Sequence, residues 1–180
     1  MSEVTGDVRY PIGLFETQPY TQELKTEWLR DIKFLPNDIE LAIQNLDEHQ
    51  FDTPYREGGW TVKQLVHHIA DSHMNAYIRI KLALTEDNPT IKPYEEKLWA
   101  NLTDVSTVPV NVSVTLLHAL HRRWYAAIEN LDKEQFLNKS VYHPDQQKIL
   151  SLWHLLGMYA WHGRHHVAHI MKLKEQKGWY

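Results

Sequence analysis

The 180-residue chain contains no cysteine, which excludes disulfide bonds, thiolate metal ligands and a cysteine nucleophile. It also lacks a strong charge of one sign: 19 basic and 23 acidic residues give a formal net charge of −4. No cationic face for a nucleic-acid backbone is therefore expected. No apolar run approaches the ~20 residues that span a bilayer, and Met1–Asp7 lacks the features of a secretory signal. We expect a cytoplasmic protein without nucleic-acid or membrane partners.

The composition is typical of one globular domain. Hydrophobic residues make up 43% of the chain and charged residues 23%, as in ordinary folded proteins. A chain of this length buries roughly 70% of its unfolded surface in one core. No repeat, low-complexity tract or linker divides it, so we predict a single domain over residues 1–180.

Hydrophobic periodicity predicts an all-α fold. Apolar residues recur at threes and fours over 21–46, 61–84, 111–131 and from about Ser151 onward. Four such helices indicate a four-helix bundle, whose interior commonly holds metal sites. Gly157 and Gly163 lie inside the last helix, where they either allow a close approach by a neighbour or are merely tolerated.

The segments between these helices carry turn-forming residues. Residues 1–20 are predicted to form an extended arm laid on the body, and 86–110 a long connection with a short helix near 94–101. Residues 132–150 could form a small hairpin before the last helix. Thr61 and Gln64 have the spacing of a capping box. Pro36 is expected to kink or break the first helix near Leu35.

The most specific chemical feature is a run of four histidines: His162, His165, His166 and His169. Helical side chains four residues apart have Cβ atoms about 5–6 Å apart, so His162 and His166 can direct two nitrogens at one ion. Neutral imidazole is the usual nitrogen ligand of zinc, nickel and copper. His165 is about 100° off this axis and is expected to face the bundle seam or solvent. His169 is expected in the pocket wall or behind a ligand.

A third ligand is expected from the second helix, which carries His67 and Asp71. A lone histidine on an apolar helix is commonly a hydrogen-bonded core residue, but together with His162 and His166 we interpret His67 as a ligand. Asp71 lies four residues later on the same face. It could orient His67, act as a fourth ligand or a general base, or simply pair with Arg79.

The remaining histidines carry weaker signals. His118 and Arg122 could form an anion-binding face, although a solvated or interhelical salt-bridge face is the favoured interpretation. Four others have no partner at a useful spacing and are treated as background: His49, His68, His73 and His143.

A helix-opening Trp60-Thr61 followed by His67 and Asp71, together with the histidine run of the last helix, resembles the DinB-like superfamily and within it the YfiT branch. The similarity extends over nearly the whole chain, including Tyr10-Pro11-Ile12-Gly13 and Trp153-His154. It implies a four-helix bundle, commonly a homodimer, with one divalent ion, zinc or nickel, per subunit. Three histidines hold the ion, which correspond here to His67, His162 and His166.

Three protein ligands and an open position are typical of a catalytic metal site. One interpretation, which we favour, is a hydrolase in which metal-activated water attacks a small-molecule substrate. A second is an S-transferase for a small thiol such as bacillithiol, an activity that the resemblance also implies. A third is a metal-binding bundle without turnover, its shell closed by Asp71 or His169. Both enzymes need a polar group near the ion, for which Asp71, His169 and Tyr55 are candidates.

Overall fold

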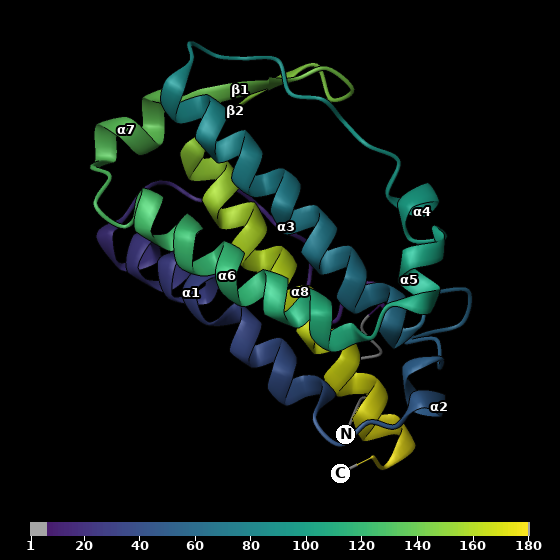
Figure 1. The fold of residues 1–180 in the computed structure, drawn as a ribbon. Helices are drawn as coiled ribbons and strands as arrows, with labels where there is room; N and C mark the ends of the chain where they lie inside the picture. The colour runs from purple at the N-terminus through teal and green to yellow at the C-terminus, as the bar shows by residue number, and fades with distance from the viewer. Residues whose placement is uncertain (1–6, 180) are drawn as a thin grey trace.

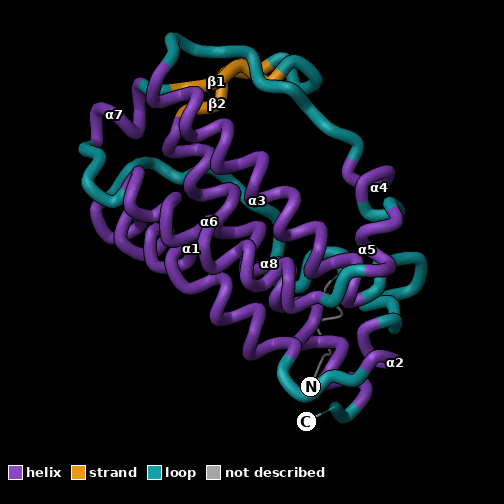
Figure 2. The backbone as a smooth tube through the Cα atoms, viewed as in Figure 1, coloured by secondary structure: helices purple, strands orange, loops and turns teal. Residues whose placement is uncertain are grey.

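The computed structural model describes residues 7–179, and within them the chain forms a mostly helical four-helix bundle (Figures 1 and 2). The long helices are α1 (Gln22–Ile43), α3 (Val62–Thr85), α6 (Val110–Ile128) and α8 (Leu152–Lys177). The connections contain α2 (Glu48–Phe51), α4 (Glu96–Trp99), α5 (Thr103–Thr107), α7 (Lys133–Asn138), β1 (Ser140–His143) and β2 (Lys148–Ser151). The predicted fold class is confirmed.

The long helices are arranged so that successive ones are not always neighbours. Helix α1 packs against α6 and α8, and α3 packs against the same two helices. Helices α1 and α3 therefore occupy opposite corners. The connection through α2 carries the chain across the end of the bundle near which the C-terminus lies (Figure 1).

The predicted helix starts are made by local side-chain caps. Thr61 Oγ1 accepts a hydrogen bond from the Gln64 amide at 3.1 Å, and Gln64 Oε1 accepts one from the Thr61 amide at 3.0 Å. Ser151 caps α8 by accepting from the amide of His154. These bonds satisfy amides that have no partner in the first turn of a helix. The predicted capping box at the start of α3 is confirmed, and α8 begins close to the predicted residue.

Pro36 does not end the first helix, because α1 continues through it. Proline has no N–H and therefore leaves the carbonyl four residues earlier without its helical donor. That carbonyl belongs to Ile32, and it accepts a hydrogen bond from Nδ1 of His121 on α6. Of the kink or break expected near Leu35, the break is absent, and a neighbouring helix supplies the donor that the Ile32 carbonyl lacks.

Two glycines let α8 approach α1 closely. A Cβ atom at Gly157 would lie 2.7 Å from the Trp28 ring, and one at Gly163 would lie 2.7 Å from the Leu35 side chain. Both distances are shorter than van der Waals contact. The close-approach interpretation of these glycines is confirmed.

The connections match the predictions in outline. Strands β1 and β2 pair antiparallel, with Ser140 opposite Ser151, in the hairpin expected before α8. Helix α7 was not predicted, although Asp132 and Gln135 form a capping box at its start. Residues 7–20 of the arm lie along α8, where Gln18 and Gly13 carbonyls accept the indole N–H groups of Trp153 and Trp161. Residues 1–6 of the predicted arm lie outside the described residues.

A layer of histidines lies between two apolar clusters of the core. One cluster, at the hairpin end, includes Trp28, Trp124 and Leu155, and the other includes Ile39, Leu65 and Ile170. His73 on α3, His118 and His121 on α6 and the four-histidine run on α8 fall in sequence between the residues of the two clusters. Buried polar side chains at this level need partners, because without them each costs about 1–3 kcal/mol.

Candidate metal centre

Three imidazoles from two helices converge at this level of the bundle. His162 and His166 come from α8 and His68 from α3. The Nε2 atom of His162 lies 3.0 Å from Nε2 of His166 and 3.3 Å from Nε2 of His68. The three residues are close enough for each to offer one nitrogen to a single ion. We call them the histidine triad.

The separations in the triad are compatible with one shared metal ion, although 3.0 Å is also an ordinary hydrogen-bond distance. Two nitrogens bound tetrahedrally to one zinc ion lie about 3.4 Å apart, because each Zn–N bond is about 2.1 Å. Facing Nε2 lone pairs repel each other unless a proton or a cation lies between them. The donor set is all nitrogen, which suits zinc or nickel and disfavours magnesium or calcium.

The triad residues are held in the neutral form that binds metals. Burial lowers the pKa of His68 to about 4. Burial, reinforced by the neighbouring imidazoles, also lowers the pKa values of His162 and His166 well below the usual value. A neutral ring keeps a free lone pair at neutral pH, so no proton has to leave before an ion binds.

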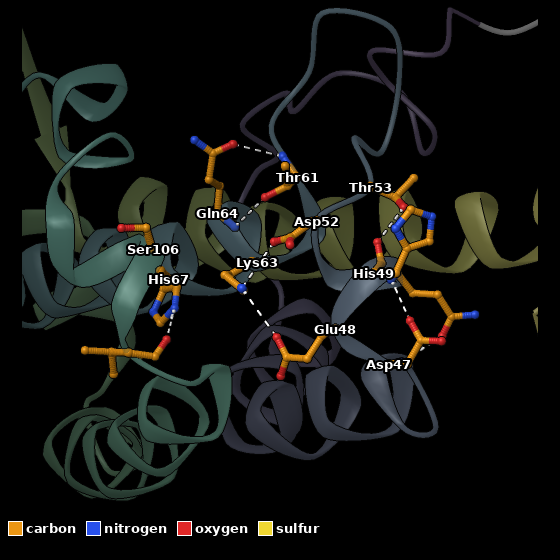
Figure 3. A network of polar contacts seen from close by, with 12 residues as sticks. Asp47, Glu48, His49, Asp52, Thr53, Thr61, Lys63, Gln64, His67 and Ser106 are labelled. Carbon is orange, nitrogen blue, oxygen red and sulfur yellow. Dashed lines mark hydrogen bonds and ion pairs between the residues drawn. The ribbon is translucent and has the colours of Figure 1, made fainter.

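The structure does not bring His67 to this group and places it on another face of α3. Its Nδ1 lies 2.8 Å from Oγ of Ser113. Its Nε2 lies 3.1 Å from the Val108 carbonyl oxygen, the contact drawn as a dashed line in Figure 3. This is the hydrogen-bonded core histidine that was weighed against the ligand role. The sequence-based placement of His67 beside His162 is corrected: adjacent helical residues differ by 100° in direction, and His68 is the one that faces α8.

Two histidines that were treated as background belong to this region. His68 is in the triad, and His73 Nε2 lies 3.1 Å from Nδ1 of His162. Helical phase was the available signal, but α3 is buried around most of its circumference from Leu65 to Ala70. The apolar pattern therefore could not show which of two adjacent histidines faces α8.

Asp71 lies on the face of α3 that His67 occupies, as its spacing predicted. Burial, with a smaller contribution from the Asp104 carboxylate, raises the pKa of Asp71 to about 6. Within residues 7–179, its carboxylate makes no hydrogen bond to a histidine and is in no candidate metal group. Arg79, its other suggested partner, donates instead to Oη of Tyr159 at 2.9 Å.

The other two histidines of the α8 run form a pair of their own. His165 is buried, with its ring stacked on Trp161 at 4.5 Å, and its Nε2 lies 3.1 Å from Nε2 of His169. His169 also packs against the Tyr55 ring at 4.2 Å. His165 is outside the triad, but its ring centroid lies 5.1 Å from that of His166. It is one of three residues, with His166 and His169, that form a second group of possible ligands.

A pocket of about 400 Å³ reaches the triad at His162. Its wall comes from α3, α8, the hairpin and the segment before α4, and it includes Ser72, Arg79, Tyr159 and Glu96. His162 is the partly exposed member of the triad, whereas His68 and His166 are buried. A small molecule in this pocket would therefore meet the triad at one exposed edge.

Two further expectations concern surfaces away from the triad. His118 lies 3.4 Å from Glu40 across the α1–α6 seam and both side chains are exposed, which fits the interhelical salt-bridge interpretation. Among the helices in residues 7–179, none combines the length and the apolar character needed to cross a bilayer.

The model of the DinB superfamily matches residues 32–170, which include the whole triad. The chain belongs to the DinB superfamily. Its relatives include proteins of Bacillus cereus (strain AH820) and Bacillus anthracis (strain CDC 684 / NRRL 3495), each 53% identical over 175 residues. These matches cover 97% of this chain and 99% of the relatives, both of which are named "putative metal-dependent hydrolase".

A solved structure has the same fold. YfiT from Bacillus subtilis, described as a probable metal-dependent hydrolase with an unusual four-helix bundle topology, superposes with a TM-score of 0.92 at 45% identity. The match covers 96% of this chain and 99% of YfiT. This chain, in which α1 and α3 occupy opposite corners, therefore shares its overall fold with YfiT.

Proposed function

We propose that this protein is a metal-dependent hydrolase whose histidine triad, His68, His162 and His166, holds one zinc or nickel ion. The observation that carries the proposal is the convergence of three Nε2 atoms, one of which belongs to His162, a residue that lines a pocket. The names of the relatives support a hydrolytic, metal-dependent activity. Three protein ligands leave a position for water or substrate, as catalytic sites do and structural sites do not.

A divalent ion at such a site supplies Lewis-acid chemistry and lowers the pKa of a water molecule from 15.7 to about 7. The chain's own residues supply the rest. His162 presents its exposed edge to the pocket, and Arg79 and Tyr159 form a hydrogen-bonded pair in the pocket wall. A guanidinium there suits a small substrate with an anionic or carbonyl oxygen, because it donates several hydrogen bonds from one plane.

Asp71 and His169 remain our candidates for proton transfer. A carboxyl with a pKa of about 6 can accept a proton near neutral pH, which favours Asp71 as a base. His169 is reached from the triad through His166, whose ring centroid lies 6.1 Å from its own. Neither side chain is hydrogen-bonded to the triad nitrogens, so each would act through a bound water or substrate.

The test is an assay of the zinc- and nickel-loaded protein against activated esters and amides, in parallel with a small thiol plus an electrophile. We expect ester or amide turnover in the wild type and in His67→Ala, and none above background in His68→Ala. Turnover that requires the thiol would replace the hydrolase with the S-transferase. A loaded protein that is inactive in both assays would indicate a metal-binding bundle without turnover.

A further inference from the structure

A line of hydrogen bonds joins His162 to the main chain of α1 through two histidines outside the triad. His162 Nδ1 lies 3.1 Å from Nε2 of His73, and His73 Nδ1 lies 3.0 Å from Nε2 of His121. His121 Nδ1 in turn contacts the carbonyl oxygen of Ile32. The line takes one residue from each long helix of the bundle, in the order α8, α3, α6 and α1.

The carbonyl end of the line fixes the position of every proton along it. A carbonyl oxygen only accepts, so Nδ1 of His121 carries the hydrogen. A neutral imidazole has one donor and one acceptor, which makes Nε2 of His121 the acceptor for His73. Nδ1 of His73 must then be the donor to His121, which leaves Nε2 of His73 as an acceptor. Nδ1 of His162 is therefore the donor to His73. His162 is thus left with an unprotonated Nε2, the atom that faces His68 and His166.

Pro36 makes this anchor possible. In a regular helix the carbonyl of Ile32 would accept the amide hydrogen of residue 36, but proline has none. The carbonyl is consequently free for His121, and a buried carbonyl without a donor would be costly. The proline that we expected to break α1 instead provides the acceptor at which the line ends.

The surroundings keep these rings neutral. His73 and His121 are fully buried, and both pack against the ring of Trp124, with centroids 5.7 and 5.4 Å away. Burial lowers the pKa of His121 to about 4. The line ends on a carbonyl oxygen, which has no proton to release. It therefore fixes which ring nitrogen of each histidine carries the hydrogen, and protons cannot leave at that end.

We propose that His73 and His121 are positioning residues that, anchored on the Ile32 carbonyl left free by Pro36, hold His162 as its Nδ1–H tautomer with Nε2 directed at the ion. The proposal rests on the proposed function, since it takes His162 as a metal ligand. Partners of this kind fix the orientation of a ligating imidazole and raise its basicity, and their loss typically weakens metal binding about 10- to 100-fold.

The first test is the tautomeric state of the metal-free wild type, measured from nitrogen-15 shifts and long-range couplings of protein labelled at histidine. We expect His73, His121 and His162 all to carry hydrogen on Nδ1, whereas a free neutral imidazole in water favours Nε2–H. A proton on Nε2 of metal-free His162 would overturn the proposal. This measurement needs no variant and no bound ion.

The second test compares His73→Gln with His73→Phe by zinc competition against a chelator. The Gln side-chain oxygen can take the place of Nε2 and accept from His162, so we expect affinity within a few-fold of the wild type. We expect His73→Phe to bind about 10- to 100-fold more weakly. Wild-type affinity in a His73→Phe variant with a native circular-dichroism spectrum would overturn the proposal. A wild type that binds no divalent ion would defeat the proposed function instead, and the nitrogen-15 spectra would still decide the tautomers.

Discussion

At the scale of single residues, the positions of His67 and His68 decide which face of α3 can contribute a metal ligand. His67 is satisfied by Ser113 and the Val108 carbonyl, so its nitrogens already have partners. His68 differs: its Nε2 lies 3.3 Å from Nε2 of His162, and its ring packs on Trp60 at 4.5 Å. A side chain whose polar neighbours are other imidazoles is better suited to bind an ion.

Asp71 gives a prediction about stability and pH. Its pKa of about 6 in the folded protein exceeds the unfolded value of 3.8, so the folded state binds more protons between these two pH values. The free energy of unfolding should therefore fall as pH rises from about 4 to 6, and Asp71 should disfavour folding at pH 7.

Asp71→Asn removes this penalty. We expect it to raise the unfolding free energy at pH 7 by about 1 kcal/mol, allowing for the partial exposure of the group, and to change it little at pH 4. Urea unfolding at the two pH values measures the difference. A variant that is destabilised at pH 7 but not at pH 4 would show that Asp71 makes a favourable contact in its charged form.

The sequence identified only part of the histidine triad. His162 and His166 were predictable because a spacing of four on one helix leaves little freedom. His68 and His73 were not, because they meet His162 only through the packing of α3 on α8. Short-range spacing contains no information about which face of one helix meets another.

At the scale of elements, the contact between α8 and α1 depends on two small residues. Gly157 lies against the indole of Trp28, which is buried and rigid, whereas Gly163 lies against the flexible end of Leu35. An added methyl group at either position gains helix propensity of about 1 kcal/mol. Overpacking opposes this gain by about 1–3 kcal/mol, and the size of the penalty depends on how well the neighbour can move.

Gly157→Ala should consequently be the more harmful of the two substitutions. We expect it to lower the unfolding free energy by about 1–2 kcal/mol, and Gly163→Ala to be close to neutral because the Leu35 side chain can rotate. Denaturant titration of both variants side by side makes the comparison. A Gly157→Ala protein more stable than the wild type would mean that α1 and α8 separate more easily than their packing indicates.

Element positions were predictable where local chemistry sets them. The capping residues Thr61 and Ser151 marked the starts of α3 and α8, and turn residues marked the hairpin. The path of α1 through Pro36 was not predictable. The donor that the Ile32 carbonyl lacks comes from His121, which lies 89 residues away along the chain. A local rule about proline fails when a distant side chain supplies what the local sequence lacks.

At the scale of the whole molecule, the histidine layer lies between two apolar clusters. Its contacts reach all four long helices. The triad joins α3 to α8, and the line through His73 and His121 continues to α6 and α1. An ion bound by the triad would link two helices that are far apart in sequence. Metal binding and global stability should therefore be coupled.

Zinc should raise the melting temperature of the wild type. Free zinc at 100 times its dissociation constant adds about 2.7 kcal/mol to folding stability, which corresponds to about 5–10 °C for a chain of this size. Calorimetry with and without zinc measures the shift. His68→Ala should show almost none, and an equal shift in that variant would place the stabilising ion elsewhere.

The most direct test of the account is the zinc content of the wild type, His67→Ala and His68→Ala after loading and dialysis. The two substitutions remove the same side chain from adjacent positions of α3. We expect about one tightly held ion per chain in the wild type and in His67→Ala, and nearly none in His68→Ala. A His68→Ala protein that keeps its zinc while His67→Ala loses it would contradict the proposed triad.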